Sequence, residues 1–200
     1  MAKSTKEKIL EAALEIFARD GYAETNLKDI AQAVGIVKSA LYRHFESKEA
    51  IFNAVTDMMA EYYEKNMGSE EKLPDIPQST DELYEMTLKM VNFTVHDRKI
   101  IQTRKILLSE QFRDEKIRDL ADRYFLYGTE AMFTKIFSAM MDNGTIKRCD
   151  PEILAFSYTS PVTSLIHLCD RDPAKEKDAM EMLDRFIRCF IEQFGVNKSK

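Results

Sequence analysis

Hydrophobic residues recur at every third or fourth position along most of the chain, a spacing that predicts α-helices. The clearest case lies near the C-terminus, where one apolar stripe keeps this spacing until Gly195 ends it. The stripe consists of Ala179, Leu183, Phe186, Ile187, Phe190, Ile191 and Phe194. The chain has only six glycines and five prolines, too few for the many turns of an all-β fold. We therefore predict an all-α fold.

Capping residues mark where several of these helices begin. Ser4 stands three residues before Glu7, the spacing of a capping box. Further N-cap candidates are Ser47, Ser79 and Asp150. With these starts, the pattern predicts helices over about 4–20, 26–34, 38–45, 47–65, 79–96, 99–112 and 115–142, and two more that begin near 150 and 179. Pro161 falls inside the helix that begins near 150, so we expect a kink there.

Residues 26–45 read NLKDIAQAVGIVKSALYRHF and contain two helices too short to be stable alone. Asn26 is the expected cap of the first, and Gly35 can take the positive φ that turns the chain sharply between them. Ala31 is small enough for another helix to approach. Two short helices at a steep angle, the second turned outward, form a helix-turn-helix, the motif that places a recognition helix in the DNA major groove.

Charge alone does not predict DNA binding. The formal net charge is −5, and residues 1–50 hold eight basic and eight acidic side chains. A nucleic-acid interface must therefore depend on where the charges lie. The three cysteines are far apart and form no CxxC pair, which favours a reducing compartment. The N-terminus lacks the apolar core of a signal peptide and no run is long enough for a membrane span, so we expect a cytoplasmic protein.

The candidate DNA contacts are the polar and small residues expected on the outer side of the helix-turn-helix. Those at the start of the second helix suit base edges, whereas its later residues and the cap region of the first suit phosphates. The candidates are Thr25, Asn26, Lys28, Lys38, Ser39, Ala40, Tyr42, His44 and Lys48. A lysine near a helix start, such as Lys48, is electrostatically unfavourable without a counter-charge, and phosphate would supply one. Tyr42 and His44 have a plainer alternative, packing at the end of a short helix.

Residues 5–55 closely resemble the DNA-binding domain of the tetracycline-repressor (TetR) family of bacterial regulators. The matching residues are Ala13, Phe17, Gly21, Thr25, Ile30, Ala31, Gly35, Leu41, Tyr42, His44, Phe45 and Lys48. The resemblance implies a helix-turn-helix domain over 1–48 and a helical effector-binding and dimerisation domain over 49–200. It also implies a homodimer that binds a palindromic double-stranded DNA operator and releases it when a small molecule binds. One departure is Val37, where the family often has a capping serine; losing that cap costs about 1 kcal/mol, tolerable if Ile36 and Val37 pack well.

The second domain offers candidates for an effector site and for a dimer interface. Met adapts to irregular shapes and suits a broad apolar pocket, although ordinary core packing is the plainer explanation for each such residue. The effector candidates are Tyr62, Met90, Phe93, Arg104, Leu107 and Tyr127. The interface candidates are Leu165, Phe186, Phe190 and Phe194, because an apolar last helix suits a four-helix dimer contact. The alternative is that this stripe is buried within one subunit.

Enzyme chemistry is not indicated. His44, His96 and His167 are far apart, and the sequence has no metal-ligand cluster, nucleophile elbow or glycine-rich phosphate loop. We therefore expect no catalysis, metal or cofactor. We predict a ligand-responsive transcriptional regulator, and specifically a repressor. Two alternatives stay open: a helical binding protein that no longer reads DNA, and a DNA-binding protein without an effector.

Overall fold

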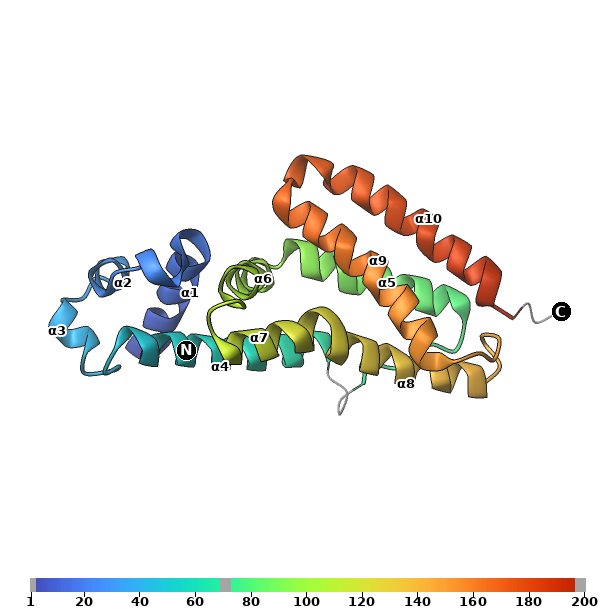
Figure 1. Ribbon diagram of the computed structural model, residues 1–200, viewed down its shortest axis with the longest axis horizontal. Helices are drawn as coiled ribbons and strands as arrows, with labels where there is room; N and C mark the ends of the chain where they lie inside the picture. Colours follow the sequence, from blue (N-terminus) through green and yellow to red (C-terminus); the bar gives the residue numbers. More distant parts are fainter. Residues whose placement is uncertain (1–2, 69–72, 197–200) are drawn as a thin grey trace. The chain divides into compact units, whose positions relative to one another are not determined.

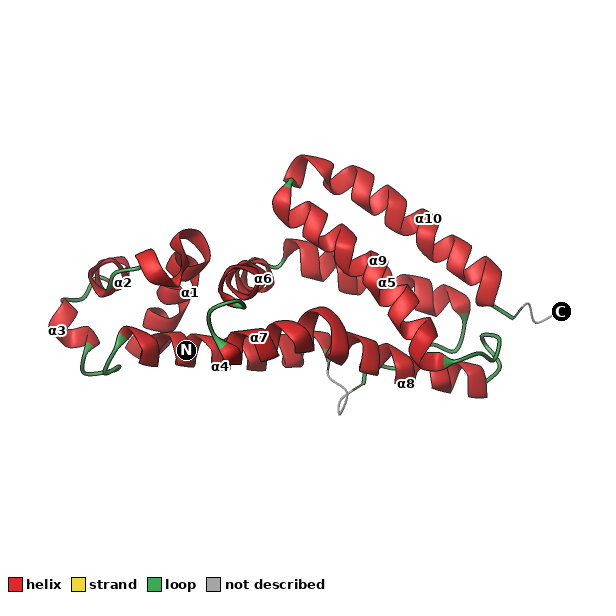
Figure 2. Cartoon of the chain, in the orientation of Figure 1, coloured by secondary structure: helices red, strands yellow, loops and turns green. Residues whose placement is uncertain are grey.

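The computed structural model describes residues 3–68 and 73–196, and these fold into helices joined by short loops (Figures 1 and 2). The elements are α1 (Thr5–Glu24), α2 (Leu27–Val34), α3 (Lys38–Leu41), α4 (Lys48–Met67), α5 (Thr80–His96), α6 (Arg98–Glu110), α7 (Glu115–Asp122), the π-helical turn η1 (Arg123–Tyr127), α8 (Gly128–Asp142), α9 (Pro151–Arg171), the 3₁₀ turn η2 (Pro173–Lys175) and α10 (Glu176–Phe194). The only extended pairing among the described residues is a single bridge between Ile146 and Gly195. The predicted all-α fold is confirmed.

The predicted helix starts at the four caps are confirmed. The Ser4 hydroxyl accepts a hydrogen bond from the Glu7 N–H (3.2 Å), and the Ser4 N–H donates to the Glu7 carboxylate (2.7 Å), which completes the capping box. The caps of α4, α5 and α9 are Ser47, Ser79 and Asp150, each accepting from a backbone N–H two or three residues on. These bonds satisfy donors that the first turn of a helix otherwise leaves without partners.

The chain forms two compact units, one from the described residues of 1–66 and 98–121 and the other from those of 67–97 and 122–196. These units group helices by packing: α6 lies with the N-terminal helices because it packs on α1. The functional division into 1–48 and 49–200 stays a prediction.

The core of the first unit forms where α1, α2 and α4 meet. Phe17 is buried and meets Phe52 edge-to-face at 5.2 Å between ring centroids, a favourable aromatic geometry. Ile30 of α2 and Leu41 of α3 are fully buried. Neither short helix is stable alone, so burial of these side chains holds both in place.

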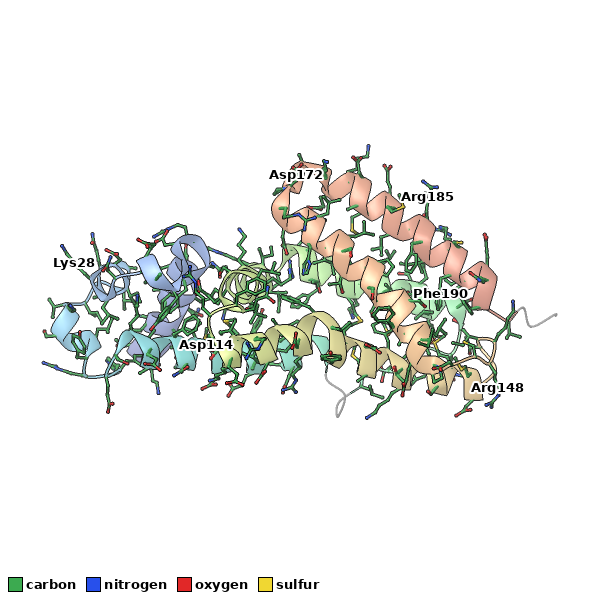
Figure 3. All side chains as sticks on the ribbon, viewed as in Figure 1. Lys28, Asp114, Arg148, Asp172, Arg185 and Phe190 are labelled. Atoms are coloured by element: carbon green, nitrogen blue, oxygen red, sulfur yellow. The ribbon has the colours of Figure 1, made fainter. Side chains whose placement is uncertain are left out.

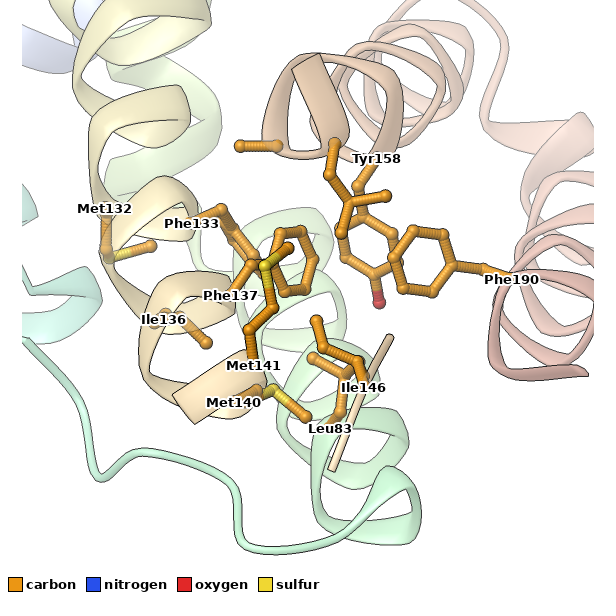
Figure 4. Close-up of a cluster of buried hydrophobic side chains, with 12 residues drawn as sticks. Leu83, Met132, Phe133, Ile136, Phe137, Met140, Met141, Ile146, Tyr158 and Phe190 are labelled. Atoms are coloured by element: carbon orange, nitrogen blue, oxygen red, sulfur yellow. The ribbon is translucent and has the colours of Figure 1, made fainter. Parts of the chain in front are cut away.

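The core of the second unit lies around Tyr158 of α9 (Figure 4). The Tyr158 ring lies 5.3 Å from Phe137 of α8 and 4.5 Å from Phe190 of α10, measured between centroids. Its hydroxyl and that of Thr87 in α5 are 2.7 Å apart, so the one polar atom of this ring has a partner. Four helices thus share one aromatic centre.

This packing changes the interpretation of the C-terminal stripe. Phe190 is 6 % exposed and packs inside its own chain, so its predicted role at the dimer interface is wrong. Phe186 and Phe194 are partly buried against the same core, and Leu165 packs on a neighbouring cluster that contains Leu183. The stripe is buried by α8 and α9 of the same subunit, the alternative that periodicity alone left open.

The predicted helix over 115–142 is interrupted. A π-helical turn, η1, separates α7 from α8, and the Gly128 N–H donates to the Arg123 carbonyl five residues earlier. A Cβ at position 128 would lie 2.4 Å from that carbonyl oxygen, closer than real atoms approach. Glycine is therefore the residue that fits this wider turn.

Candidate nucleic-acid interface

The turn between α2 and α3 has the geometry that its sequence predicts. Gly35 adopts φ 76°, ψ 29°, and its N–H donates to the Gln32 carbonyl at 3.1 Å. The next N–H, from Ile36, donates to the Ala31 carbonyl at 3.0 Å. These bonds end α2 in a left-handed cap, a conformation that glycine adopts without strain. The chain can then turn sharply into α3.

The second helix is shorter than predicted. The sequence suggested 38–45, whereas α3 ends at Leu41 and is followed by turns. The Arg43 N–H donates to the Ala40 carbonyl and the His44 N–H to the Leu41 carbonyl, three residues back rather than four. This tightening keeps Leu41 and Phe45 buried while the three side chains between them face solvent.

Val37 does not pack as expected. It occupies the N-cap of α3 in an extended conformation, with no side-chain hydrogen bond to the helix start. Its side chain is 68 % exposed, and only its neighbour Ile36 is partly buried. The absent serine cap is thus not offset by packing of Val37.

Most predicted DNA contacts lie on the exposed side of α2 and α3. Lys28 extends from α2 into solvent (Figure 3), and the ammonium group of Lys38 lies 5.8 Å from the centroid of the Tyr42 ring. Asn26, Ser39, Tyr42 and His44 are also exposed, and Ala40 is partly so. Asn26 stands at the N-cap of α2 as predicted, but its amide donates to the Glu24 carbonyl instead of capping the helix.

Two predicted contacts are engaged inside the domain instead. Thr25 is 2 % exposed, and its hydroxyl donates to the Gly21 carbonyl at 2.7 Å. The Lys48 ammonium donates to the carbonyls of Tyr22 (2.7 Å), Ala23 (3.1 Å) and Thr25 (2.9 Å). These carbonyls are available because Gly21, at φ 79°, interrupts the helical conformation near the end of α1. The counter-charge expected for Lys48 is therefore the end of α1, and neither residue belongs to the exposed surface.

The structure adds two cations that the sequence reasoning missed. Lys6, in the first turn of α1, lies 5.6 Å from the centroid of the Phe45 ring and is exposed. Arg43 is exposed between Tyr42 and His44. The position of Arg43 between the candidates Tyr42 and His44 was a usable signal in the sequence. Lys6 approaches Phe45 only through the tertiary fold, which the sequence does not show. We define the basic surface as Lys6, Lys28, Lys38, Arg43 and the exposed polar residues Asn26, Ser39, Tyr42 and His44.

Two acidic residues of α1 form ion pairs within the first unit. Glu11 pairs with Lys3 (2.7 Å) and with Lys99 of α6 (3.2 Å), and Glu15 pairs with Arg98 (2.6 Å). The hydrogen bond from Lys3 holds the pKa of Glu11 below its ordinary value. These two carboxylates are therefore partly neutralised by basic residues of the same unit.

The predicted effector residues fall in both compact units. Tyr62, Arg104 and Leu107 belong to the first, and Met90, Phe93 and Tyr127 to the second. Leu107 is fully buried, whereas Tyr127 is 62 % exposed.

The described residues contain no group of His, Cys, Asp or Glu side chains that could hold a metal ion. None of their helices combines the length and the apolar character that a membrane span requires.

Comparison with known proteins identifies a family with a similar helix-turn-helix. Residues 9–55 match the model of the bacterial regulatory proteins of the TetR family. The HTH-type transcriptional regulator AcrR of Shigella flexneri is 31% identical over 103 residues, 49% of this chain and 45% of AcrR. The negative regulator IcaR of the Staphylococcus aureus biofilm operon icaADBC is 32% identical over 95 residues, 48% of this chain and 50% of IcaR. The chain spans about half the length of these curated relatives.

The fold of the whole chain is also found in solved structures. SmeT in complex with triclosan superposes with a TM-score of 0.73 at 20% identity, covering 98% of this chain and 94% of SmeT. SmeT is the repressor of the Stenotrophomonas maltophilia multidrug efflux pump SmeDEF. A regulator from Haloarcula marismortui gives 0.72 at 14% identity, covering 96% and 98%. Residues 9–55 thus match the helix-turn-helix domain of the TetR family, and the whole chain shares its fold with solved TetR-family regulators.

Proposed function

We propose that this protein is a repressor that binds a palindromic operator as a homodimer and releases it when a small molecule binds. The observation that carries the proposal is the basic surface, where four cations and four polar side chains of the helix-turn-helix face solvent together. Cations of this kind contact phosphates, and polar groups at the start of a recognition helix read base edges. Two such helices must lie about 34–36 Å apart to enter successive major grooves.

The pairing of two carboxylates of α1 supports this proposal. Glu11 and Glu15 are paired with basic residues of the same unit, so they add little repulsion toward DNA. A positive surface on a neutral domain attracts phosphate through local charge, and binding then releases condensed counterions. Salt dependence therefore separates this proposal from a helical protein that no longer reads DNA.

For the dimer we propose the outward sides of α9 and α10 as the interface. Ile153 and Phe156 of α9 are 65 % and 49 % exposed and lie one turn apart on one side of that helix. Met182 of α10 is half-exposed as well, and α9 and α10 pack side by side (Figure 1). Two such pairs related by a twofold axis form a four-helix contact that covers these apolar groups.

We also propose that a small-molecule effector binds this chain and controls its release from DNA. The mechanism requires that the ligand bind the released form better than the DNA-bound form, since only this difference shifts the equilibrium. Ligand and operator then weaken each other by the same factor. SmeT, a protein with the same fold, has been solved with triclosan, which makes an apolar small molecule a reasonable first probe.

The experiment is selection of the purified chain against a random DNA pool, followed by titration of the enriched sequence at several salt concentrations. We expect a palindrome whose affinity falls steeply as salt rises and is greatly reduced by Tyr42→Ala. Absence of enrichment, or an affinity that does not change with salt concentration, would contradict operator binding.

The effector is tested by thermal shifts with triclosan and with a panel of drugs and metabolites. A compound that raises the melting temperature of the chain should also release the operator when operator is present.

The dimer is tested by sedimentation of two matched variants. Phe156→Glu places a charge in the proposed interface and should give folded monomers with weakened operator binding. Phe112→Glu is the control, because Phe112 is exposed in the turn after α6 and belongs to the other compact unit. Dimers of Phe156→Glu would show that another surface joins the subunits.

A further inference from the structure

Val37 is a largely exposed valine beside the basic surface, and local stability does not explain a valine at this position. Serine, threonine, aspartate or asparagine at an N-cap would accept a hydrogen bond from the helix start, which valine cannot do. Exposure of 68 % also leaves most of its methyl surface in water. Both effects favour a polar residue here, so the valine calls for another explanation.

Its position suggests what that explanation is. The Val37 carbonyl accepts from the N–H groups of Ala40 (2.9 Å) and Leu41 (3.3 Å), which fixes the residue at the first turn of α3. Leu41 is fully buried, so this turn is anchored to the core while the Val37 side chain extends from it into solvent. In a helix-turn-helix, the N-terminal end of the second helix is the part that meets base edges.

The major groove offers one apolar group, the 5-methyl of thymine, and apolar side chains recognise it by contact. We propose that Val37 reads the operator by placing its methyl groups against the 5-methyl of one thymine in each half-site. The inference rests on the proposed DNA-binding function and assigns a specificity-determining role to this residue. Lys38 and Tyr42 beside it supply polar contacts, whereas Val37 supplies the preference for a methylated pyrimidine.

Uracil substitution tests the contact without changing hydrogen bonding. Each thymine of the selected operator is replaced in turn by uracil, which lacks only the 5-methyl group. We expect uracil at one thymine of each half-site to lower the affinity about three- to fivefold. This is the change in affinity that the burial of one methyl group produces. At the same position, cytosine should bind more weakly than 5-methylcytosine, because the latter restores the methyl.

Two variants assign the effect to this residue. Val37→Ser removes the methyl groups but adds an N-cap, and Val37→Ala removes most of the apolar surface without adding a cap. Both should bind the thymine and uracil operators within about twofold of each other, whereas Lys38→Ala should keep the discrimination while binding both more weakly. Since Val37→Ser should be at least as stable as the parent, its loss of discrimination cannot be ascribed to unfolding.

Three results would overturn the inference. An operator that is bound specifically, yet tolerates uracil at every thymine, removes the methyl contact while the proposed function stands. Discrimination that persists in Val37→Ser assigns the contact to another residue. A chain that enriches no sequence at all contradicts the proposed function, and the inference with it.

Discussion

Lys48 and Tyr22 are joined twice: the ammonium donates to the Tyr22 carbonyl at 2.7 Å and lies 4.5 Å from the centroid of the Tyr22 ring. With the bonds to Ala23 and Thr25, this one side chain satisfies three carbonyls at the end of α1. Charge-assisted hydrogen bonds of this kind are stronger than neutral ones. The start of α4 is thereby fixed to the end of α1, beside the recognition helix.

Replacing Lys48 should affect folding rather than counterion release. Lys48→Ala leaves carbonyls without their donor, and we expect the free energy of unfolding to fall by about 1–3 kcal/mol. Among molecules that remain folded, the slope of log affinity against log salt should stay unchanged. Lys38→Ala is the matched comparison: stability should be nearly unchanged, and the slope should decrease in magnitude by about 1 per subunit. A reduced slope in Lys48→Ala would show that its charge reaches phosphate after all.

Glu110 makes a corresponding contact from α6. Its carboxylate accepts a hydrogen bond from the Tyr22 N–H at 3.2 Å, next to the positive φ of Gly21. Glu110→Ala should lower the free energy of unfolding by about 1–3 kcal/mol, because a partly buried N–H loses its acceptor. Glu110→Gln keeps an acceptor oxygen and should recover much of the loss, as measured by urea denaturation. Equal losses in both variants would point to the carboxylate charge instead.

The correction at Phe190 has a direct test. Phe190→Ala opens a cavity against Tyr158 and Phe137 and should cost about 3–5 kcal/mol of unfolding free energy. Phe156→Ala, on the outward side of α9, should change the stability of the folded monomer by no more than about 0.5 kcal/mol. If Phe190→Ala gave stable monomers, Phe190 would belong to the subunit interface.

Tyr158 predicts how stability responds to alkaline pH. Burial raises the pKa of its phenol well above the ordinary value near 10, and the bond to Thr87 only partly opposes this. The unfolded chain therefore releases this proton first as pH rises. The contribution of Tyr158 to stability is complete below about pH 10 and is lost progressively above it.

Urea denaturation between pH 8 and 11 measures this effect. Tyr158→Phe should lower stability near neutral pH, because Thr87 loses its hydroxyl partner, but should flatten the decline above pH 10. Tyr42→Phe, which removes an exposed hydroxyl, should leave the curve unchanged. An equal decline in parent and Tyr158→Phe would refute the assignment.

Local signals in the sequence predicted local structure well, and tertiary contacts account for the errors. The caps at Ser4 and Asp150 act over three residues, so the sequence contains everything that determines them. Lys48 was misassigned because its partners are carbonyls that become available only when Gly21 interrupts α1. The spacing of residues in the sequence does not show that these carbonyls become available.

The C-terminal stripe and the π turn show two other limits. The spacing of Phe186, Phe190 and Phe194 identifies a buried face, yet burial by the same chain and burial by a partner produce the same periodicity. The turn at Gly128 holds one more residue than an α turn, which a helical pattern read at 3.6 residues per turn does not resolve. The exposed side of α3, by contrast, was predicted well because its residues are adjacent in the chain.

The internal pairing of basic residues limits how many charges the helix-turn-helix can offer to DNA. Of the eight cations within residues 3–50, Lys3 and Arg19 pair with carboxylates and Lys48 with carbonyls, which leaves Lys6, Lys8, Lys28, Lys38 and Arg43. Two subunits would then displace on the order of ten condensed cations, for a salt exponent no steeper than about −9. An operator complex with a steeper exponent must recruit basic residues from beyond residue 50.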